Sequence, residues 1–178
     1  MNHFLSRAIA LYTGKFERKE NHAMTNLTEW SPRQLAGQVL RTASRGAYGA
    51  AGLYGRSVSG RALHWLSLGR GRQRLLIAAG QHANEWITSP LLMRFAEEFA
   101  AGVWPGAADE VKLWLAPLVN PDGAALVTGE LGSGPLFENA GRIAANFPGI
   151  PFPSGWKANI GGVDLNLQFP AGWQEARR

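Results

Sequence analysis

The sequence predicts an α/β fold with a mixed, largely parallel sheet flanked by helices. Two short apolar segments, residues 74–79 and 111–119, have the length and composition of strands, and an amphipathic segment of helical length lies between them. A strand, a helix and a strand in that order form a crossover unit, which makes the two strands parallel neighbours. At 178 residues, 46% of them hydrophobic, the chain is long enough for one globular domain.

The chain before the first strand divides into three parts. Residues 1–30 are polar and irregular and are predicted as a leader, which leaves residues 31–178 for the domain. Ser31-Pro32 is a typical helix start, with serine as the cap and proline in the first position, so a helix is predicted over residues 33–43. The glycine-rich segment 46–60 is predicted to be a linker.

Three strands are predicted, over residues 63–68, 74–79 and 111–119. The second is apolar enough to be buried on both faces of the sheet. The second and third should pair in parallel, since a helix connects them.

The helix between these strands has two candidate starts, with Asn84 or Ser89 as the cap. The second choice puts Pro90 at the first helical position, where its missing N–H costs nothing, and Gly102 stops the helix in either case. Glycine, proline and asparagine dominate residues 120–162, so this stretch is predicted to form functional loops with no strong element longer than a turn.

The composition excludes several classes of protein. The chain has no cysteine, so it has neither disulfides nor cysteine-bound zinc. No apolar run approaches the roughly 18 residues of a membrane span, and no signal peptide is recognisable, so a cytoplasmic protein is expected. The net charge is +5, but the densest basic run, residues 70–74, lies between two apolar segments and is interpreted as a solvated turn. A nucleic-acid partner is therefore not expected, although an RNA-binding protein stays an alternative.

Two polar clusters follow the predicted parallel strands, at residues 81–85 and 120–123. Ligands in open α/β sheets collect beyond the carboxyl ends of the strands, so both clusters should lie on the same rim. His82 and Glu85 are three residues apart, which puts both side chains on one side of a helical turn. An imidazole and a carboxylate suit zinc. The alternative that Glu85 only stabilises a helix N-terminus stays open.

Four blocks of the sequence resemble the M14 metallocarboxypeptidases, in the same order along the chain. Residues 55–63 resemble that family's Gly-x-Ser-x-x-Gly-Arg segment, and residues 80–88 its first zinc motif. Residues 119–123 resemble its Asn-Pro-Asp-Gly turn, and residues 162–170 its Gly-Val-Asp-x-Asn block. The resemblance implies a zinc-dependent peptidase with a mixed sheet between helices.

The resemblance also implies roles for single residues. His82 and Glu85 would be the first two zinc ligands, and Asp164 the carboxylate that holds the histidine by its other ring nitrogen. Asn166 matches the asparagine that binds the terminal carboxylate of the substrate. Lys157 stands where the family has an arginine that polarises the scissile carbonyl. Simpler roles stay open: Asp164 could only fix a turn, and Lys157 could be a solvated loop residue.

Leu167 stands where the usual carboxypeptidase has an arginine that grips the free C-terminal carboxylate of the substrate. A leucine cannot bind a carboxylate. This variant is similar to the bacterial branch of the family that cleaves γ-D-glutamyl-diaminopimelate bonds, so a murein peptide is the expected substrate.

No histidine follows Glu85, because the four histidines are His3, His22, His64 and His82. The family's third ligand, a histidine, therefore has no counterpart, although catalytic zinc sites normally have three protein ligands. Glu175 follows the Gly-Val-Asp block too closely to match the family's general base, a glutamate. The sequence predicts an incomplete, inactive fragment with an exposed sheet edge and an uncovered apolar face, for which a complementing C-terminal segment would be the partner. A non-catalytic module that binds wall peptides is the alternative.

Overall fold

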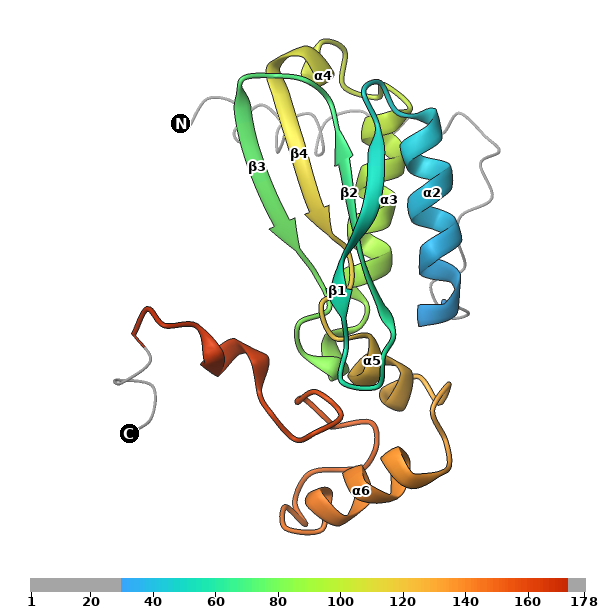
Figure 1. Ribbon diagram of the computed structural model, residues 1–178, viewed down its shortest axis with the longest axis vertical. Helices are drawn as coiled ribbons and strands as arrows, with labels where there is room; N and C mark the ends of the chain where they lie inside the picture. The colour runs from blue at the N-terminus through green and yellow to red at the C-terminus, as the bar shows by residue number, and fades with distance from the viewer. Residues whose placement is uncertain (1–29, 173–178) are drawn as a thin grey trace.

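The computed structural model describes residues 30–172, so the predicted leader lies almost wholly outside the described residues. Its centre is a four-stranded sheet with the strands in the order β1-β2-β4-β3 (Figure 1). The strands are β1 (Ala50–Arg56), β2 (Ala62–Leu68), β3 (Gln73–Ala78) and β4 (Val111–Ala116). Strand β2 is antiparallel to both β1 and β4, whereas β3 and β4 run parallel.

The prediction of a mixed α/β sheet is confirmed, and so are the three predicted strands and the parallel pairing of the second with the third. Leu75 of β3 lies opposite Leu113 of β4. The sheet is not largely parallel over the described residues, because one strand pairing is parallel and two are antiparallel.

Strand β1 corrects the prediction that residues 46–60 form a linker. It pairs with β2 from Ala50 opposite Ser67 to Arg56 opposite Ala62. This glycine-rich segment lacks the alternation of apolar and polar side chains that is typical of a strand. Its backbone pairing with β2 holds it in the sheet. Gly52 is required there, since a Cβ atom would come within 2.8 Å of the Trp65 indole nitrogen.

The first helix is confirmed, and it starts with a tighter turn. The 3₁₀ turn η2 (Pro32–Gln34) leads into α2 (Leu35–Arg45). Ser31 is the cap, as predicted, and Pro32 takes the first position, where no N–H is needed.

Helix α3 (Thr88–Ala100) begins at neither of the predicted caps, because Ile87 precedes its first residue. Asn84 lies in a separate 3₁₀ turn, η3 (Ala83–Glu85). The Thr88 hydroxyl accepts a hydrogen bond from the Gly80 N–H (2.8 Å) and donates one to the Glu85 carbonyl (2.8 Å), so Thr88 links the strand end, the turn and the helix. Pro90 lies in the first helical turn and is tolerated there.

Residues 120–162 contain two helices, which corrects the prediction of loops without elements longer than a turn. They are α5 (Pro121–Val127) and α6 (Pro135–Ala144), and the short elements α4 (Ala107–Glu110) and η4 (Leu165–Gln168) complete the described part of the chain. Both helices begin with proline at the first position. A small apolar cluster beneath the sheet joins them to later loops, and its buried members are Ala83, Leu126, Ala140, Trp156 and Ile160.

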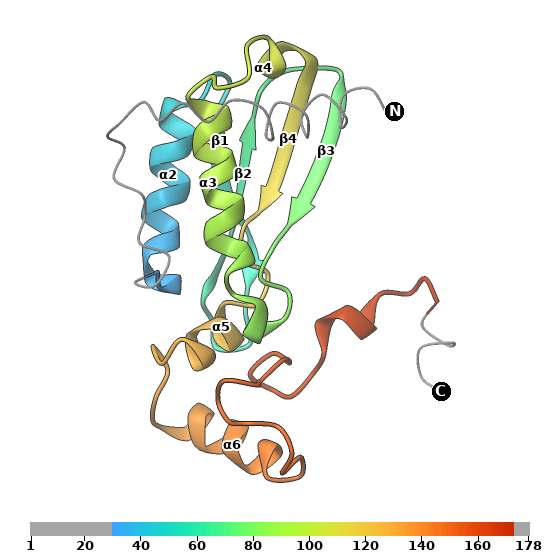
Figure 2. The same ribbon diagram turned by 180° about the vertical axis from the view of Figure 1, so that it is seen from behind.

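The main core lies between the sheet and helices α2 and α3, which cover the same face (Figure 2). Alternate residues of β4 point into it, so Val111, Leu113 and Leu115 are buried. Leu66 and Leu68 of β2 and Val39 and Met93 of the helices complete its centre. Each such side chain contributes roughly 1.5–3 kcal/mol through burial.

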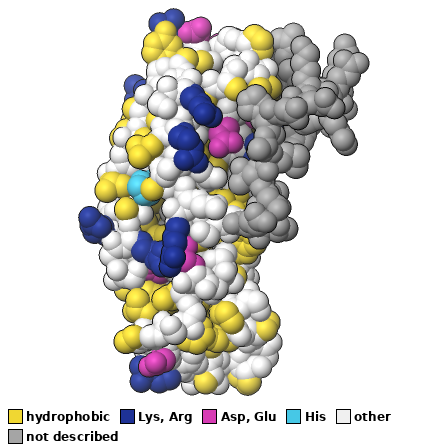
Figure 3. All heavy atoms as spheres, turned by 90° about the vertical axis from the view of Figure 1, so that its right-hand side faces the viewer, with side chains coloured by type: hydrophobic (Ala, Val, Ile, Leu, Met, Phe, Trp, Pro, Cys, Tyr) yellow, Lys and Arg dark blue, Asp and Glu magenta, His cyan; other side chains and the backbone are white. Residues whose placement is uncertain are grey.

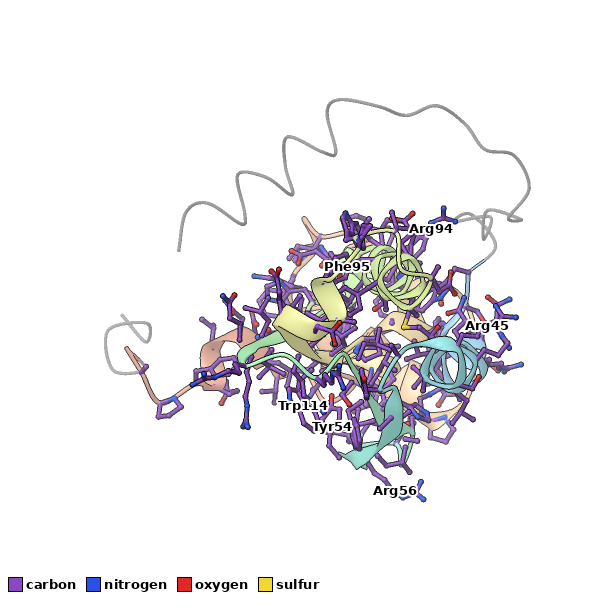
Figure 4. All side chains as sticks on the ribbon, turned by 90° about the horizontal axis from the view of Figure 1, so that it is seen from above. Arg45, Tyr54, Arg56, Arg94, Phe95 and Trp114 are labelled. Atoms are coloured by element: carbon purple, nitrogen blue, oxygen red, sulfur yellow. The ribbon has the colours of Figure 1, made fainter. Side chains whose placement is uncertain are left out.

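The opposite face of the sheet and the outer edge of β3 are exposed. Leu76 of β3 is 79% exposed and Trp114 of β4 is 38% exposed, so the prediction that β3 is buried on both faces is wrong. Among residues 30–172, strand β3 pairs on one side only, because it is the last strand in the sheet order. Viewed from above, Trp114 and Tyr54 lie on the side of the sheet away from α3 (Figure 4). An exposed edge and an uncovered apolar face are therefore present in the described part of the chain.

No helix among the described residues is both long enough and apolar enough to cross a membrane. On the face shown in Figure 3, lysine and arginine side chains are scattered among apolar and uncharged ones and form no continuous basic patch.

Candidate metal centre

The turn after β3 brings His82 and Glu85 together. Gly80 has φ +60°, and a Cβ atom there would come within 2.6 Å of the Ser89 hydroxyl oxygen, so the turn requires glycine. His82 is the residue before the 3₁₀ turn η3, and Glu85 is the last residue of that turn. A 3₁₀ turn has three residues per turn, which aligns side chains three apart. The Nδ1 atom of His82 lies 3.1 Å from Oε1 of Glu85.

The other ring nitrogen of His82 faces Asp164, as the resemblance implies. Nε2 lies 3.3 Å from Oδ1 of Asp164, and the histidine side chain is only 13% exposed. The distance is that of an ion pair, but the angles are not those of a hydrogen bond, so Nε2 is a buried nitrogen with an incomplete partner. A small rotation of either side chain would complete the bond, because the two atoms already lie within hydrogen-bond reach.

Asp164 is held by its own loop and by Lys157. Its Oδ1 accepts a hydrogen bond from the Asn166 backbone N–H (2.9 Å), and its Oδ2 lies 3.3 Å from the Lys157 ammonium nitrogen. Partial burial by itself would raise the pKa of Asp164, but the Asn166 N–H, the Lys157 ammonium and His82 outweigh it and hold this pKa below its usual value. Asp164 is therefore poised to be an ionised partner for the imidazole.

The remaining predicted residues lie at the margin of this site. The Lys157 side chain is about half exposed, and its ammonium group contacts Asp164. Asn166 is exposed, and its Oδ1 accepts a long hydrogen bond (3.4 Å) from the Gln81 side chain. Leu167 is also exposed and follows Asn166 in the turn η4. The structure thus brings all five predicted residues to one end of the sheet: His82, Glu85, Lys157, Asp164 and Asn166.

The donor chemistry of this site fits zinc in part. An imidazole nitrogen and a carboxylate oxygen face one another, and the second imidazole nitrogen is turned to a carboxylate, which is the arrangement of a metal-binding histidine. Within residues 30–172, however, no group of three or more His, Cys, Asp or Glu side chains is arranged to hold a metal ion. The described residues therefore bring together one imidazole and one carboxylate of the kinds that bind zinc, but no third donor.

Sequence reasoning gave no functional weight to Asp122, which the structure shows as a buried anchor. Its side chain is 2% exposed and accepts hydrogen bonds from the Ser57 hydroxyl (2.9 Å), the Ser59 N–H (3.0 Å) and the Ser59 hydroxyl. The Arg61 guanidinium lies 3.5 Å away and also pairs with the buried carboxylate of Glu130. The tip of the β1–β2 hairpin is thereby fixed to α5. These residues lie in two of the sequence blocks that resemble the M14 family, at 55–63 and 119–123, and the presence of both blocks could have indicated this contact.

Comparison with known proteins agrees with this geometry. The sequence profile of the zinc carboxypeptidase family (Peptidase_M14) matches residues 51–178. A γ-D-glutamyl-L-diamino acid endopeptidase 1 of Lysinibacillus sphaericus is 39% identical in an alignment of 130 residues that covers 67% of this chain and 32% of that protein. The uncharacterized protein YqgT of Bacillus subtilis is 35% identical in an alignment of 133 residues that covers 67% of this chain and 35% of that protein.

Solved structures share the fold at low sequence identity. A metallo-carboxypeptidase from Burkholderia cenocepacia is 20% identical with a TM-score of 0.57, over 80% of this chain and 33% of that one. The carboxypeptidase A of Helicoverpa armigera is 15% identical with a TM-score of 0.54, over 87% of this chain and 33% of that one. The chain thus spans about a third of the length of the proteins that it matches.

Proposed function

Because the chain belongs to the zinc carboxypeptidase family, we propose that it forms half of the active site of a zinc-dependent peptidase. One observation carries the proposal: Nδ1 of His82 faces the Glu85 carboxylate while Nε2 faces the Asp164 carboxylate. In this arrangement Nδ1 of His82 can bind a metal beside the Glu85 carboxylate. The Asp164 carboxylate, on the Nε2 side, orients the ring.

His82 and Glu85 would hold zinc, and Asp164 would fix the ring of His82. Zinc, when bound, supplies a Lewis acid beside the scissile amide. Lys157 would place a positive charge near the carbonyl oxygen of the substrate. To do so, its ammonium group must either leave Asp164 or contact Asp164 and the substrate at the same time. Asn166 would donate its amide N–H to an acceptor of the substrate, since its Oδ1 is engaged by Gln81.

The proposed substrate is a murein peptide cleaved at its γ-D-glutamyl-diaminopimelate bond. Two points support this choice: the relative from Lysinibacillus sphaericus is named for γ-D-glutamyl-L-diamino acid cleavage, and Leu167 stands in place of a carboxylate-binding arginine. An exposed leucine offers an apolar contact instead of a charged one, which favours substrates without a free carboxylate at that subsite.

The proposal requires a complementing segment that supplies a third ligand and a general base. The described residues offer two donors, and the relatives are about three times as long as the region that this chain shares with them. Strand β3 leads directly into the His82 turn, and the backbone groups on its outer edge pair with no other described strand, so an additional strand could use them. We expect no peptidase activity from the 178 residues alone, and turnover of a γ-D-glutamyl-diaminopimelate peptide by the purified chain would overturn this requirement.

The zinc site is tested by titrating the purified chain with zinc chloride in a calorimeter, in the wild type and in Glu85→Gln. The variant keeps the size of the side chain but removes its charge, so we expect it to bind zinc at least about tenfold more weakly. Glu98→Gln is the matched control, because Glu98 lies in α3 and pairs only with Arg94 (2.6 Å) among the described residues. Equal zinc affinity in the wild type and Glu85→Gln would refute the assignment of Glu85 as a ligand.

A second candidate function is a module that binds wall peptides without cleaving them. The observation in its favour is that the described residues hold no set of three metal donors. Such a module would bind a γ-D-glutamyl-diaminopimelate peptide equally well with and without EDTA and in Glu85→Gln. Binding that requires zinc would instead support the peptidase site.

A further inference from the structure

Asn120 joins three segments at the carboxyl end of the sheet. Its side chain is almost wholly buried, with the residue 2% exposed. Oδ1 accepts a hydrogen bond from the Gly123 N–H (3.0 Å) in α5. Nδ2 donates to the Gln81 carbonyl (3.3 Å), just before His82, and to the Ala158 carbonyl (3.0 Å). One amide group therefore contacts the turn of residues 80–85, which we call the His82 loop, and the segment 156–160, which we call the Lys157 loop.

The two loops also touch each other directly. The Ala83 N–H donates to the Lys157 carbonyl (3.0 Å), and Ala83 is completely buried. The Lys157 loop is anchored below by Trp156 and Ile160, both buried in the small apolar cluster that also contains Ala83. The separation of His82 from Lys157 thus depends on contacts between the loops and not on the strands alone.

Gly123 provides a second, independent observation at the same place. A Cβ atom on Gly123 would lie 2.6 Å from Asn120 Nδ2, 2.7 Å from Ala83 Cβ and 2.8 Å from the Ala158 carbonyl oxygen. These atoms belong to the asparagine, to the His82 loop and to the Lys157 loop. The close approach of all three is possible only because residue 123 has no side chain.

We propose that Asn120 and Gly123 form a clamp that fixes the His82 loop against the Lys157 loop, which makes Asn120 a positioning residue for the metal centre. The part of the proposal that concerns zinc rests on the proposed function. Only an amide serves here, because one side chain must accept a single hydrogen bond and donate two. An aspartate has the same shape, but it would place a carboxylate oxygen, which cannot donate, against the carbonyl oxygens of Gln81 and Ala158. Alanine would leave both carbonyl oxygens without the Asn120 donor.

The test is amide hydrogen exchange, followed by NMR, in the full 178-residue chain. The variants are Asn120→Ala, which removes the amide, and Gly123→Ala, which inserts a methyl group while favouring the helix. Gly141→Ala in α6 is the matched control, since a Cβ atom there meets nothing closer than Phe152 Cε1 at 3.8 Å. The readout is the protection of the Ala83 amide, which bonds to Lys157, relative to that of the amides in central strand β4.

We expect both clamp variants to lower the protection of Ala83 by roughly tenfold relative to β4, and Gly141→Ala to leave it unchanged. Unchanged protection of Ala83 in Gly123→Ala, or an equal loss at Ala83 and in β4, would overturn the clamp. If Asn120→Ala does not fold, Gly123→Ala alone decides the matter.

Zinc titration of the same variants separates this inference from the proposed function. Where the wild type binds zinc, the clamp predicts an affinity about tenfold lower in both variants, the size of effect seen when groups that orient a ligand are removed. A wild type that binds no zinc would sink the proposed function, while the exchange data would still decide the clamp.

Discussion

Replacement of the buried anchor Asp122 should destabilise the chain strongly. Its carboxylate accepts hydrogen bonds from Ser57 and Ser59 and lies 3.5 Å from the Arg61 guanidinium, with 2% of the side chain exposed. In Asp122→Ala these donors lose their acceptor, and the charge of Arg61 keeps only Glu130 as a partner among the described residues. The hairpin tip would then be free of α5.

The cost follows from the burial of these groups. Removal of one partner from a buried ion pair costs about 3–5 kcal/mol, because the other partner stays desolvated. Arg61 is 31% exposed and keeps its contact with Glu130, which places Asp122→Ala at the lower end, at about 3 kcal/mol. Asp122→Asn keeps one acceptor for the Ser59 N–H and should cost about 1–2 kcal/mol. A small domain has a total stability of only about 5–15 kcal/mol, so the larger loss is readily measured.

Urea denaturation followed by tryptophan fluorescence and by circular dichroism measures these differences. Asp109→Ala is the matched control, because Asp109 also pairs with an arginine, Arg70, at 2.7 Å, but both side chains are about 60% exposed. That pair contributes less than about 1 kcal/mol. If Asp122→Ala and Asp109→Ala had equal midpoints of unfolding, the reasoning from burial would be refuted.

Two other predictions concern pH and surface association. The pKa of Asp164 is lowered, so the charge of its carboxylate stabilises the folded chain at pH values above the ordinary pKa of 3.8. This stabilisation is lost as the pH falls through the lowered pKa. The difference in unfolding free energy between the wild type and Asp164→Asn should therefore be largest at neutral pH and shrink below about pH 4. A constant difference from pH 2 to pH 7 in urea titrations would contradict this sign. Leu76→Glu should raise the concentration at which light scattering detects self-association, because Leu76 is 79% exposed on the outer strand β3, and it should change stability by no more than about 0.5 kcal/mol. Unchanged association would show that the β3 edge does not mediate it.

The crossover unit and the positions of His82 and Glu85 at its end were predictable because their signals are local. The apolar segments that became β3 and β4 have strand length, and a crossover between them permits only parallel pairing. The position of His82 and Glu85 after β3 followed from the same topology, and their three-residue spacing matched the 3₁₀ turn. The contact of Asp164 with His82 was implied by the resemblance alone, since 82 positions separate the two residues in the sequence.

The elements that sequence reasoning missed depend on partners distant in the chain. Strand β1 has no alternating pattern, and its strand conformation comes from pairing with β2. Helix α6 has one fully buried residue, Ala140, and its position is set by the apolar cluster around Trp156. The exposure of β3 was missed for a different reason: an apolar segment is typical of a strand inside a sheet, whereas β3 is the edge strand of the described sheet.

The orientation of His82 is independent of whatever pairs with the outer edge of β3. Asp164 contacts one ring nitrogen, Glu85 contacts the other, and Asn120 holds the Gln81 carbonyl next to the histidine, so all three constraints lie within residues 81–164. The core that supports them, formed by β2, β4, α2 and α3, lies on the covered face of the sheet. A strand added to β3 would therefore meet a His82 and a Glu85 that are already oriented, and under the proposed function it would need to supply donors without repacking the core. This predicts that Glu85→Gln weakens zinc binding by a similar factor with and without a complementing segment, although the absolute affinities differ.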